Sequence, residues 1–494
     1  MAGVSTEPEP FFRLSPAELG KTQFFGVTQG KSARRLNANF HQPIYQLLEI
    51  RLQEAVFTCR SLLEICSIIS DGTHHTPKYL DSGNLGVHFI SVKDVREWEV
   101  NFENTKFISE EEHQVLAKRC SPKANDILLT KIETIGKAAL VPLDAPIFDI
   151  FVSVALLRVR EDRALPTFIT YFLNSDTARM QFNRVVKGVG VPDLHLEDIA
   201  EIKVALPGIA KQHELIAAMD KARSQRRQKL AEADTLLSSL DEFILNALDI
   251  SLPSPDSRKA YAICLSQMLG ERVDAYSNQP YFQKLFTTIK SSQHPVTNLG
   301  NIAEPIFSGT TPLAKGDAYV DPPNGVRFVR SGEITKEGGV TPTSEVHIRE
   351  DIHNEKMKRS QLQRGDLLIA IVGATIGAIG IYDFNEPANI NQAIAAVRMR
   401  YNDVLVEYVC WYLRCSLGQR LLDYFKRPVA RANINLTEVG EIPIIIPSPE
   451  IQKYIIAEVH SRREEARRLR SEAETGWQNA KRWFEEQLLG TAPL

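Results

Sequence analysis

The stretch NDILLTKIETIG, residues 125–136, decides the fold because the chain contains it twice. The second copy, GDLLIAIVGATIG at residues 365–377, begins 240 residues later. Each copy is a run of apolar residues between an acidic start and a glycine turn, which is typical of a buried strand followed by a tight turn. The 494 residues are therefore first tested as two copies of one module.

Other stretches repeat at nearly the same offset on both sides of this pair. RLNANFHQPIY from Arg35 matches RVDAYSNQPYF from Arg272, and GVHFISVKDV from Gly86 matches GVRFVRSGEI from Gly325. Downstream, three pairs lie 240 residues apart: Leu173 and Leu413, Pro207 and Pro447, Gln212 and Gln452. Because order and spacing agree along the whole module, chance similarity is a poor explanation. We predict two copies, at about 35–250 and 272–490.

The first part of each module combines strand and helix patterns. Short apolar runs bounded by turn residues predict strands: VHFISV and DILLT in the first copy, VRFVRS, DLLIAIV and IGAIGIY in the second. A stretch with helical apolar spacing follows from Pro166 and from Val406, and a short strand, EIKVALP or EIPIIIP, comes next. The predicted fold class is α/β in the mixed α+β sense.

The second part of each module is a long charged helix. Apolar residues recur at steps of three and four in about 211–248 and 450–489, between faces dense in Arg, Lys and Glu. A helix this long with one apolar stripe requires a partner, and the other copy supplies one. The alternative is an ordinary helix that packs on its own domain. The predicted organisation is an N-terminal extension 1–34, domain 35–210, helix 211–250, linker 251–271, domain 272–449 and helix 450–490.

Composition excludes several classes of protein. Apolar residues make up 43% and charged residues 24%, which are ordinary globular values. The 58 basic and 61 acidic residues give a net charge of −3, which excludes a bulk polycation but not local basic patches. The six cysteines lack zinc spacing and fit a reducing cytoplasm. The sequence predicts neither a secretory signal nor a membrane span.

A search for catalytic motifs predicts a chain without its own active site. GATIGAIG from Gly373 lacks the lysine of a phosphate loop and is better explained as a turn between strands. DPPN at residues 321–324 is similar to the short motif of adenine methyltransferases but lacks its closing aromatic residue. Metal-binding, serine-hydrolase and nuclease patterns are not evident.

Two loops carry chemistry suited to DNA at the same place in both copies. SDGTHHTPK (70–78) matches SGTTPLAKG (308–316), and NRVVKGVGVPDLHL (183–196) matches KRPVARANINL (426–436). Small residues and hydroxyls let a backbone approach phosphates, while Arg and Asn can read base edges. For each single residue, a turn or a solvated charge remains the alternative. The candidate DNA contacts are Thr73, His74, Lys78, Lys93, Lys131, Arg184, Lys187, Thr310, Thr311, Lys315, Arg330, Lys336, Lys426, Arg427, Arg431 and Asn433.

Residues 35–490 resemble the DNA-specificity subunits of type I restriction–modification systems. The tandem module, the SDGTHHTP and SGTTP loops and the TIG turns carry the resemblance. So does the module end, where a proline and Gln212 or Gln452 precede the charged helix. The resemblance implies two tandem target-recognition domains with an internal pseudo-two-fold repeat. It also implies that the helices form an antiparallel coiled coil whose length sets the unread spacer of a bipartite, asymmetric site.

The resemblance further implies partners and cofactors. Double-stranded DNA and two methyltransferase subunits are the expected partners, and two restriction/translocase subunits can join them. No cofactor is expected on this chain, whereas S-adenosylmethionine, ATP and magnesium belong to the partner subunits. Because the two copies share few loop side chains, we expect two different half-sites. Two alternatives stay open: a coiled-coil protein scaffold without DNA readout and, with less support, a fused adenine methyltransferase.

Overall fold

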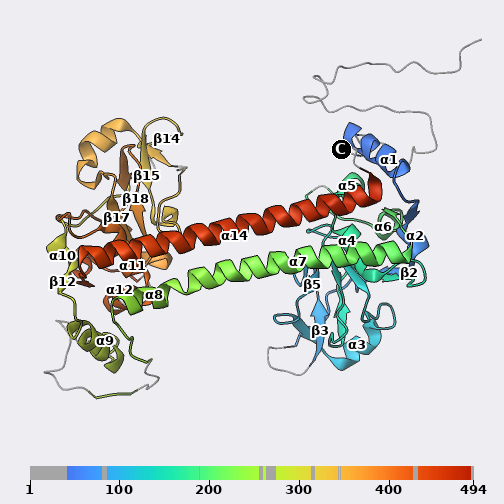
Figure 1. Cartoon of the computed structure of the whole chain (residues 1–494), viewed down its shortest axis with the longest axis horizontal. Coiled ribbons are helices and arrows are strands. Elements are labelled where there is room, and N and C mark those ends of the chain that lie inside the picture. Colours follow the sequence, from blue (N-terminus) through green and yellow to red (C-terminus); the bar gives the residue numbers. More distant parts are fainter. Residues whose placement is uncertain are drawn as a thin grey trace, which may run out of the picture. The chain divides into compact units, whose positions relative to one another are not determined.

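The computed structural model describes residues 40, 42–80, 86–188, 190–254, 260–262, 274–312, 317–342, 344, 346–426 and 432–490. The chain divides into two compact units (Figure 1). The first unit comprises Met1–Gln228 with Glu472–Leu494, and the second comprises Lys229–Ser471. Each unit thus combines one β-rich domain with parts of both long helices. The predicted extension 1–34 and most of the predicted linker 251–271 lie outside the described residues.

The duplicated apolar stretch forms an inner strand of the same four-stranded antiparallel sheet in both units. The order is β2-β10-β7-β8 in the first unit and β13-β20-β17-β18 in the second. Every residue of β7 and β17 is buried, which explains the uninterrupted apolar runs Ile127–Leu129 and Leu367–Ala370 within them. The bounds are β2 Cys66–Asp71, β7 Ile127–Thr130, β8 Ala138–Leu140, β10 Val154–Val159, β13 Phe307–Ser308, β17 Asp366–Ala370, β18 Ile379–Tyr382 and β20 Ile394–Val397.

A second sheet in each unit contains one parallel pair, β3 with β9 and β15 with β19. Its order is β6-β3-β9 in the first unit and β14-β16-β15-β19 in the second. The bounds are β3 Val87–Ile90, β6 Lys106–Ile108, β9 Phe148–Ile150, β14 Tyr319–Val320, β15 Val326–Val329, β16 His347–Ile348 and β19 Ala388–Ile390. The remaining strands pair two by two: β1 Cys59–Ser61 with β11 Lys203–Ala205, β4 Val95–Arg96 with β5 Glu99–Val100, and β12 Val296–Asn298 with β21 Pro443–Ile445.

An ion pair between a buried aspartate and a partly exposed arginine joins the same two strands in both units. The Asp126 carboxylate accepts from Nε and Nη2 of Arg158 at 2.8 and 2.7 Å. In the second unit, Asp366 accepts from the same two nitrogens of Arg398 at 2.8 Å each. The repeat predicted from sequence is therefore confirmed, because equivalent side chains make equivalent contacts in the two units. The mixed α/β fold class is confirmed as well.

Each predicted helix after the sheet is in fact two helices. The first pair is α4 (Pro166–Leu173) and α5 (Asp176–Val185), and the second is α11 (Val406–Arg414) and α12 (Ser416–Phe425). The Ser175 hydroxyl accepts from the Ala178 amide and begins α5 as an N-cap. The shorter helices are α1 Pro43–Gln53, α2 Leu62–Ile65, α3 Glu110–Leu116, α6 Leu196–Ala200, α9 Pro280–Lys290, α10 Leu299–Ile302 and α13 Leu436–Gly440.

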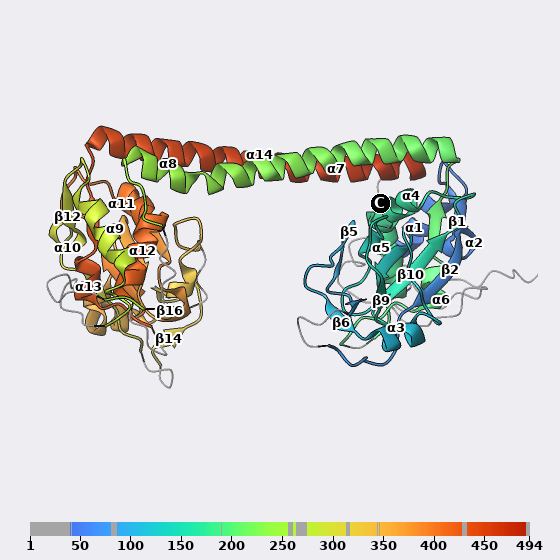
Figure 2. The same cartoon turned by 90° about the horizontal axis from the view of Figure 1, so that it is seen from below.

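The long helices are α7 (Ile209–Ser238) and α14 (Pro449–Leu489), which lie alongside each other in both views (Figures 1 and 2). The first predicted helix, 211–248, ends earlier than expected, and α8 (Leu240–Ala247) follows it. The hydroxyl of Ser239, which lies between them, donates to the Leu236 carbonyl, a local bond that tends to bend helices. The structure describes no helix that is a candidate to span a membrane.

The two long helices run antiparallel within each unit. In the first unit, Lys211 contacts Gln487 at 3.4 Å, and Arg226 contacts Glu474 at 3.4 Å. In the second unit, Arg470 contacts Asp234 at 2.8 Å, and Arg462 reaches the Ser239 hydroxyl at 2.9 Å. Residues later in α7 meet residues earlier in α14, so the expected antiparallel pairing is confirmed.

A buried glutamine joins each long helix to its domain. Oε1 of Gln212 accepts from the Leu165 amide at 2.8 Å, while Nε2 donates to the Pro207 carbonyl at 2.9 Å. Gln452 makes the equivalent bonds, with the Leu405 amide at 2.9 Å and the Pro447 carbonyl at 3.0 Å. The proline–glutamine tract therefore fixes the start of each long helix against its own domain.

Candidate nucleic-acid interface

In the first unit, two of the predicted DNA contacts, His74 and Lys131, lie around one buried carboxylate. Asp71, the last residue of β2, accepts from Arg119 at 2.8 Å and lies 3.2 Å from Nε2 of His74. Nζ of Lys131, which directly follows β7, lies 3.6 Å from the second oxygen of Asp71. Two strand ends of the central sheet therefore hold His74 and Lys131 together.

Lys131 also connects the two predicted loops. Its Nζ lies 3.5 Å from Asp193 in the second loop, and its side chain is only 6% exposed. Asp193 forms a pair of backbone hydrogen bonds with Lys187, each 2.8 Å long. Lys187 in turn lies 3.0 Å from Asp198. Lys131 thus lies between the two loops, but its two carboxylate neighbours already balance most of its charge.

Glycine is required where the first loop begins in both units. A Cβ atom on Gly72 would lie 1.7 Å from the carbonyl oxygen of Ile150, and one on Gly309 would lie 1.6 Å from that of Ile390. The next residue, Thr73, is buried, and its amide donates to the Ile150 carbonyl at 3.1 Å. These contacts set each loop against the end of a strand in the second sheet.

Helix α3 covers the loop 70–78 at the end of the first domain that faces away from α7 and α14 (Figure 2). Nε2 of His75 lies 3.6 Å from Glu112 of this helix. A cavity of about 240 Å³ separates the loop from α3 and is lined by Gly72, Thr73, His74, His75, Val115, Leu116, Arg119, Cys120, Asp149 and Ile150. Lys78 and Lys93 are exposed and add positive charge to the same domain.

Asp149 lies under α3 in an unfavourable environment. One oxygen of its carboxylate is 2.7 Å from Nδ1 of His113, and the other is buried without a hydrogen-bond partner. Burial raises the pKa of Asp149, although the bond to His113 opposes this shift. The second unit has Asn389 in the equivalent place, where its amide oxygen lies 2.5 Å from Nδ1 of His353.

We expect Asp149→Asn to stabilise the first unit at pH 7 by on the order of 1 kcal/mol. Because the pKa of Asp149 is raised in the folded state, the protonated carboxyl favours folding at low pH, and this contribution is lost as the pH rises through that pKa. The stability difference between the Asp149→Asn protein and the parent should therefore be largest at pH 7 and should shrink toward pH 4. Urea unfolding at both pH values measures it, with the exposed Asp162→Asn as control. Destabilisation at pH 7 would show instead that the carboxylate is favourable beside His113.

In the second unit, Thr311 and Arg330 line one cavity of about 540 Å³. Its other lining residues are Tyr319, Val320, Asp321, Phe328, Val346, His347 and Asn391. The Thr311 hydroxyl is hydrogen-bonded to Gln392, and Thr310 is exposed. The Arg330 guanidinium is half exposed and lies 3.9 Å from Glu333. This cavity lies near β14 and β16, again away from the long helices (Figure 2).

The second predicted loop of this unit lies beside the end of β17. The Gly373 amide donates to the Ala432 carbonyl at 3.2 Å, and the Ile434 amide donates to the Ile371 carbonyl at 3.0 Å. Asn433 between them is exposed. Lys426, at the end of α12, is half-buried. The predicted contacts Lys315, Arg427 and Arg431 lie outside the described residues.

Two predicted contacts lie in other surroundings. Nη1 of Arg184 donates to Glu49 at 2.7 Å, and the guanidinium lies over the Phe40 ring at 4.3 Å, so Arg184 holds α1 against α5. Lys336 lies beside α11, where its carbonyl accepts from Arg414. The structure therefore does not bring Lys336 together with Thr311 and Arg330.

Sequence reasoning missed the residues that organise the first site. Asp71 and Asp193 lie within the two predicted loops but are not among the predicted contacts, and Arg119 and His113 lie outside both loops. One signal was available, because His113 and His353 lie 240 residues apart, as do Asp149 and Asn389. Arg119 and Asp193 gave no signal, since only the tertiary fold brings them to Asp71 and Lys131.

Known proteins match the chain in both sequence and fold. A curated relative, the type I restriction enzyme EcoBI specificity subunit of Escherichia coli, is 28% identical over 306 residues. The match covers 62% of this chain and 60% of that relative. A solved chain described under complex assembly and conformational transition of the type I R-M system is 16% identical. It matches with a TM-score of 0.55 over 87% of this chain and 96% of its own length, so its fold is similar.

The HsdS subunit of Thermoanaerobacter tengcongensis gives a TM-score of 0.42 at 15% identity, over 88% of this chain and 97% of its own. The family described as type I restriction modification DNA specificity domain matches twice, at residues 57–232 and 296–461. The two matches coincide with the two sequence repeats and include the beginnings of α7 and α14. Since they span more than half of the chain, this protein belongs to the type I restriction modification DNA specificity domain family.

Proposed function

We propose that this chain is the DNA-recognition subunit of a type I restriction–modification complex. Each β-rich domain reads one half of a bipartite, asymmetric DNA site. The pair α7 and α14 separates the half-sites by an unread spacer. The observation that carries this function is the duplicated specificity domain, in which both copies place their polar loops at the ends of the same strands.

The charges at the two sites support DNA contact of different kinds. Exposed Lys78 and Lys93 suit phosphates, which attract any unpaired cation. Arg330 lines a cavity with Thr311 and Asn391, and this mixture of a guanidinium, a hydroxyl and an amide suits base edges. Because the two sites differ in nearly every side chain, the two half-sites should differ in sequence.

The proposed partners are double-stranded DNA and two methyltransferase subunits, and two restriction/translocase subunits can join them. The chain itself performs no catalysis and holds no cofactor, while S-adenosylmethionine, ATP and magnesium act on the partner subunits. The methyltransferase partners flip and methylate an adenine in each half-site. The complex acts in the cytoplasm.

Co-expression with the methyltransferase encoded beside it, followed by sequencing of methylated DNA, tests this function. We expect one bipartite methylated-adenine motif with unlike halves. Arg330→Ala should relax the sequence of one half only, because loss of a good base contact costs about 1–3 kcal/mol of discrimination. Lys78→Ala with Lys93→Ala should weaken DNA binding evenly across sequences and reduce the salt slope by about two.

Matched controls lie at the opposite ends of the same sheets. Lys123 precedes β7 in the first unit, and Arg364 precedes β17 in the second, and both side chains are exposed. Their alanine variants should leave both the motif and the salt slope unchanged. Normal assembly with partners but no methylated motif would favour the scaffold alternative. Binding of S-adenosylmethionine by the isolated chain would favour the fused methyltransferase.

A further inference from the structure

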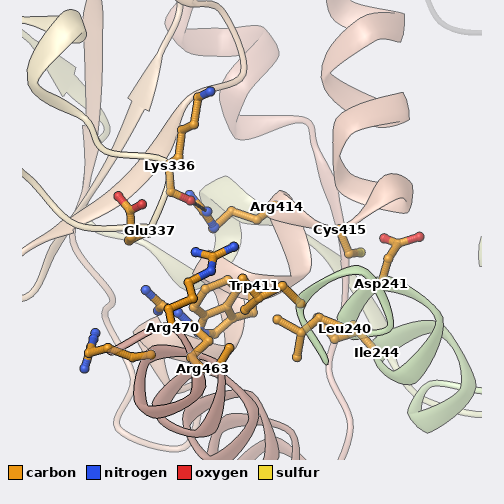
Figure 3. Close-up of a pocket in the computed structure, with 13 residues that line it drawn as sticks. Leu240, Asp241, Ile244, Lys336, Glu337, Trp411, Arg414, Cys415, Arg463 and Arg470 are labelled. Carbon is orange, nitrogen blue, oxygen red and sulfur yellow. Dashed lines mark hydrogen bonds between the residues drawn. The ribbon is translucent and has the colours of Figure 1, made fainter. Parts of the chain in front are cut away.

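A cationic cavity lies where the second domain meets its helices. It has a volume of about 610 Å³ and is lined by Leu237 at the end of α7, by α8, α11 and α14, and by the segment 336–337. Figure 3 shows Arg414, Arg463 and Arg470 gathered around Trp411, with Glu337 to one side and Asp241 beside Cys415 on the other. Its cationic lining residues are Lys336, Arg414, Arg463, Arg467 and Arg470. The acidic ones are Asp241 and Glu337, so positive charge is in excess.

The two acidic residues do not balance this charge. The Asp241 carboxylate already accepts hydrogen bonds from the backbone amide and the hydroxyl of Ser416, the first residue of α12. Glu337 forms no salt bridge among the described residues. Arg467 and Arg470 pair outward with the exposed Glu464 and Asp234.

The two arginines beside Trp411 form no salt bridge within the described part of the chain. Their guanidinium carbons lie 4.9 Å (Arg414) and 4.8 Å (Arg463) from the Trp411 ring centre. Arg414 donates only to backbone carbonyls, and its Nε is buried without a partner. Burial lowers the pKa of both groups, and the charges of Arg414 and Arg467 lower that of Arg463 further, while the negative charge of Glu337 opposes both shifts. An incoming anion would offset both the cost of burial and the repulsion.

The equivalent place in the first unit is filled and contains fewer cations. Trp98 packs on Tyr171 with ring centres 4.5 Å apart and on Trp477 at 5.8 Å. The residues 240 positions from Trp98 and Trp477 are Gly338 and Leu237, so the second unit lacks both of these indoles, although Trp411 takes the place of Tyr171. Trp98 and Gly338 lie between the equivalent pairs Val95–Val100 and Ile334–Val340 and share a positive φ, 73° and 88°.

The second unit also carries more positive charge at this place than the first unit. Arg414 has Asn174 as its counterpart in the first unit, and Arg470 has Leu230. Arg463 corresponds to Arg223, whose guanidinium lies over the Trp98 ring at 5.6 Å. Near Arg223, Asp220 accepts from the Tyr171 hydroxyl at 2.5 Å, whereas the counterpart of Asp220 is His460. At this place the second unit therefore has smaller side chains at two positions, lacks the counterpart of Asp220 and carries more cations.

We infer that this cavity of the second unit binds an oligophosphate, either the phosphate chain of a free nucleotide or successive phosphates of a nucleic-acid strand. Guanidinium groups match phosphate oxygens in fork geometry, and several converging arginines require more than one negative charge. The volume lies in the range of sites for small ligands. This inference does not depend on the proposed reading of bipartite DNA, because it concerns a different set of residues from the loop sites.

Titration calorimetry of the full chain with sodium tripolyphosphate tests the inference. We expect one site per chain, and Arg463→Met should weaken binding at least tenfold. Leu237→Trp, which restores the indole present in the first unit, should weaken it similarly by filling the cavity. Arg223→Met is the matched control, because it removes the equivalent arginine of the filled place, and binding should be unchanged.

Two further arms identify the source of the phosphates. Competition by ATP without competition by a DNA duplex would assign the site to a free nucleotide. Competition by a duplex of arbitrary sequence, with a smaller salt slope for Arg463→Met, would assign it to the nucleic-acid backbone. Either result supports the inference. It is overturned if tripolyphosphate does not bind, or if it binds equally well to Arg463→Met and Leu237→Trp proteins that retain the circular dichroism and unfolding midpoint of the parent.

Discussion

Replacing Asp126 by alanine is expected to lower the free energy of unfolding of the first domain by about 3 kcal/mol or more. Asp126 is fully buried and accepts both hydrogen bonds of the Arg158 fork. The variant keeps the guanidinium in place without its anion, and an unpaired charge in such a site is strongly unfavourable. Amide hydrogen exchange should show lost protection in β7 and β10, with little change in β17 and β20.

The second unit provides the reciprocal experiment. Asp366→Ala should remove protection from β17 and β20 and spare β7 and β10, because Asp366 and Arg398 form the equivalent pair. Asp383→Ala is the control, since its partner Arg364 is 59% exposed and Asp383 is 69% exposed. That loss should stay below about 1 kcal/mol. Equal effects of Asp126→Ala and Asp383→Ala would show that the buried pairs contribute no more than surface pairs.

Gly309→Ala is expected to destabilise the second candidate interface by about 3 kcal/mol, at the upper end of overpacking costs. The added methyl group would lie 1.6 Å from the carbonyl oxygen of Ile390, a distance that no side chain adopts. Because backbone rather than a flexible side chain is in the way, the loop must separate from the end of β19. We expect lost exchange protection in β13 and β19, together with loss of one half of the methylated motif.

Gly332→Ala serves as the control in the same domain. A Cβ on Gly332 would meet no atom within 4 Å, so stability and motif should be unchanged. In the first unit, Gly72→Ala should have the same effect as Gly309→Ala, but on the other half of the motif. An intact motif in a Gly309→Ala protein would mean that this loop does not position the DNA contacts.

The repeat made much of the fold predictable from sequence. Two copies of a buried strand and its turn fixed the inner strands β7 and β17, and the charged stripes identified α7 and α14 as paired helices. The break near Ser239 was not predictable, because it depends on one hydroxyl bond and not on the apolar period. The candidate sites were predictable as loops but not as contacts. The sequence indicates no partner for Lys131, whereas the fold places it between the carboxylates of Asp71 and Asp193.

The cationic cavity could not be predicted by comparing the sequences of the two copies alone. Gly338 and Leu237 are ordinary residues in sequence, and only comparison with the packed Trp98 and Trp477 reveals the missing volume. Repeats predict shared elements well because the same backbone needs the same apolar pattern. They predict functional surfaces poorly because loop side chains can differ between the copies without changing the shared backbone.

The composition of the first core has a consequence for the order of events during synthesis. Trp477, Phe484 and Leu488 of α14 are buried among residues of the first unit, and Glu485 accepts from the Thr177 amide there at 2.6 Å. The ribosome makes these residues only after the entire second domain. At translation rates of about 5–20 residues per second, the first domain waits roughly 10–50 s for the last part of its own core. During this interval its apolar surface is open to chaperones, and the second domain can complete its core first.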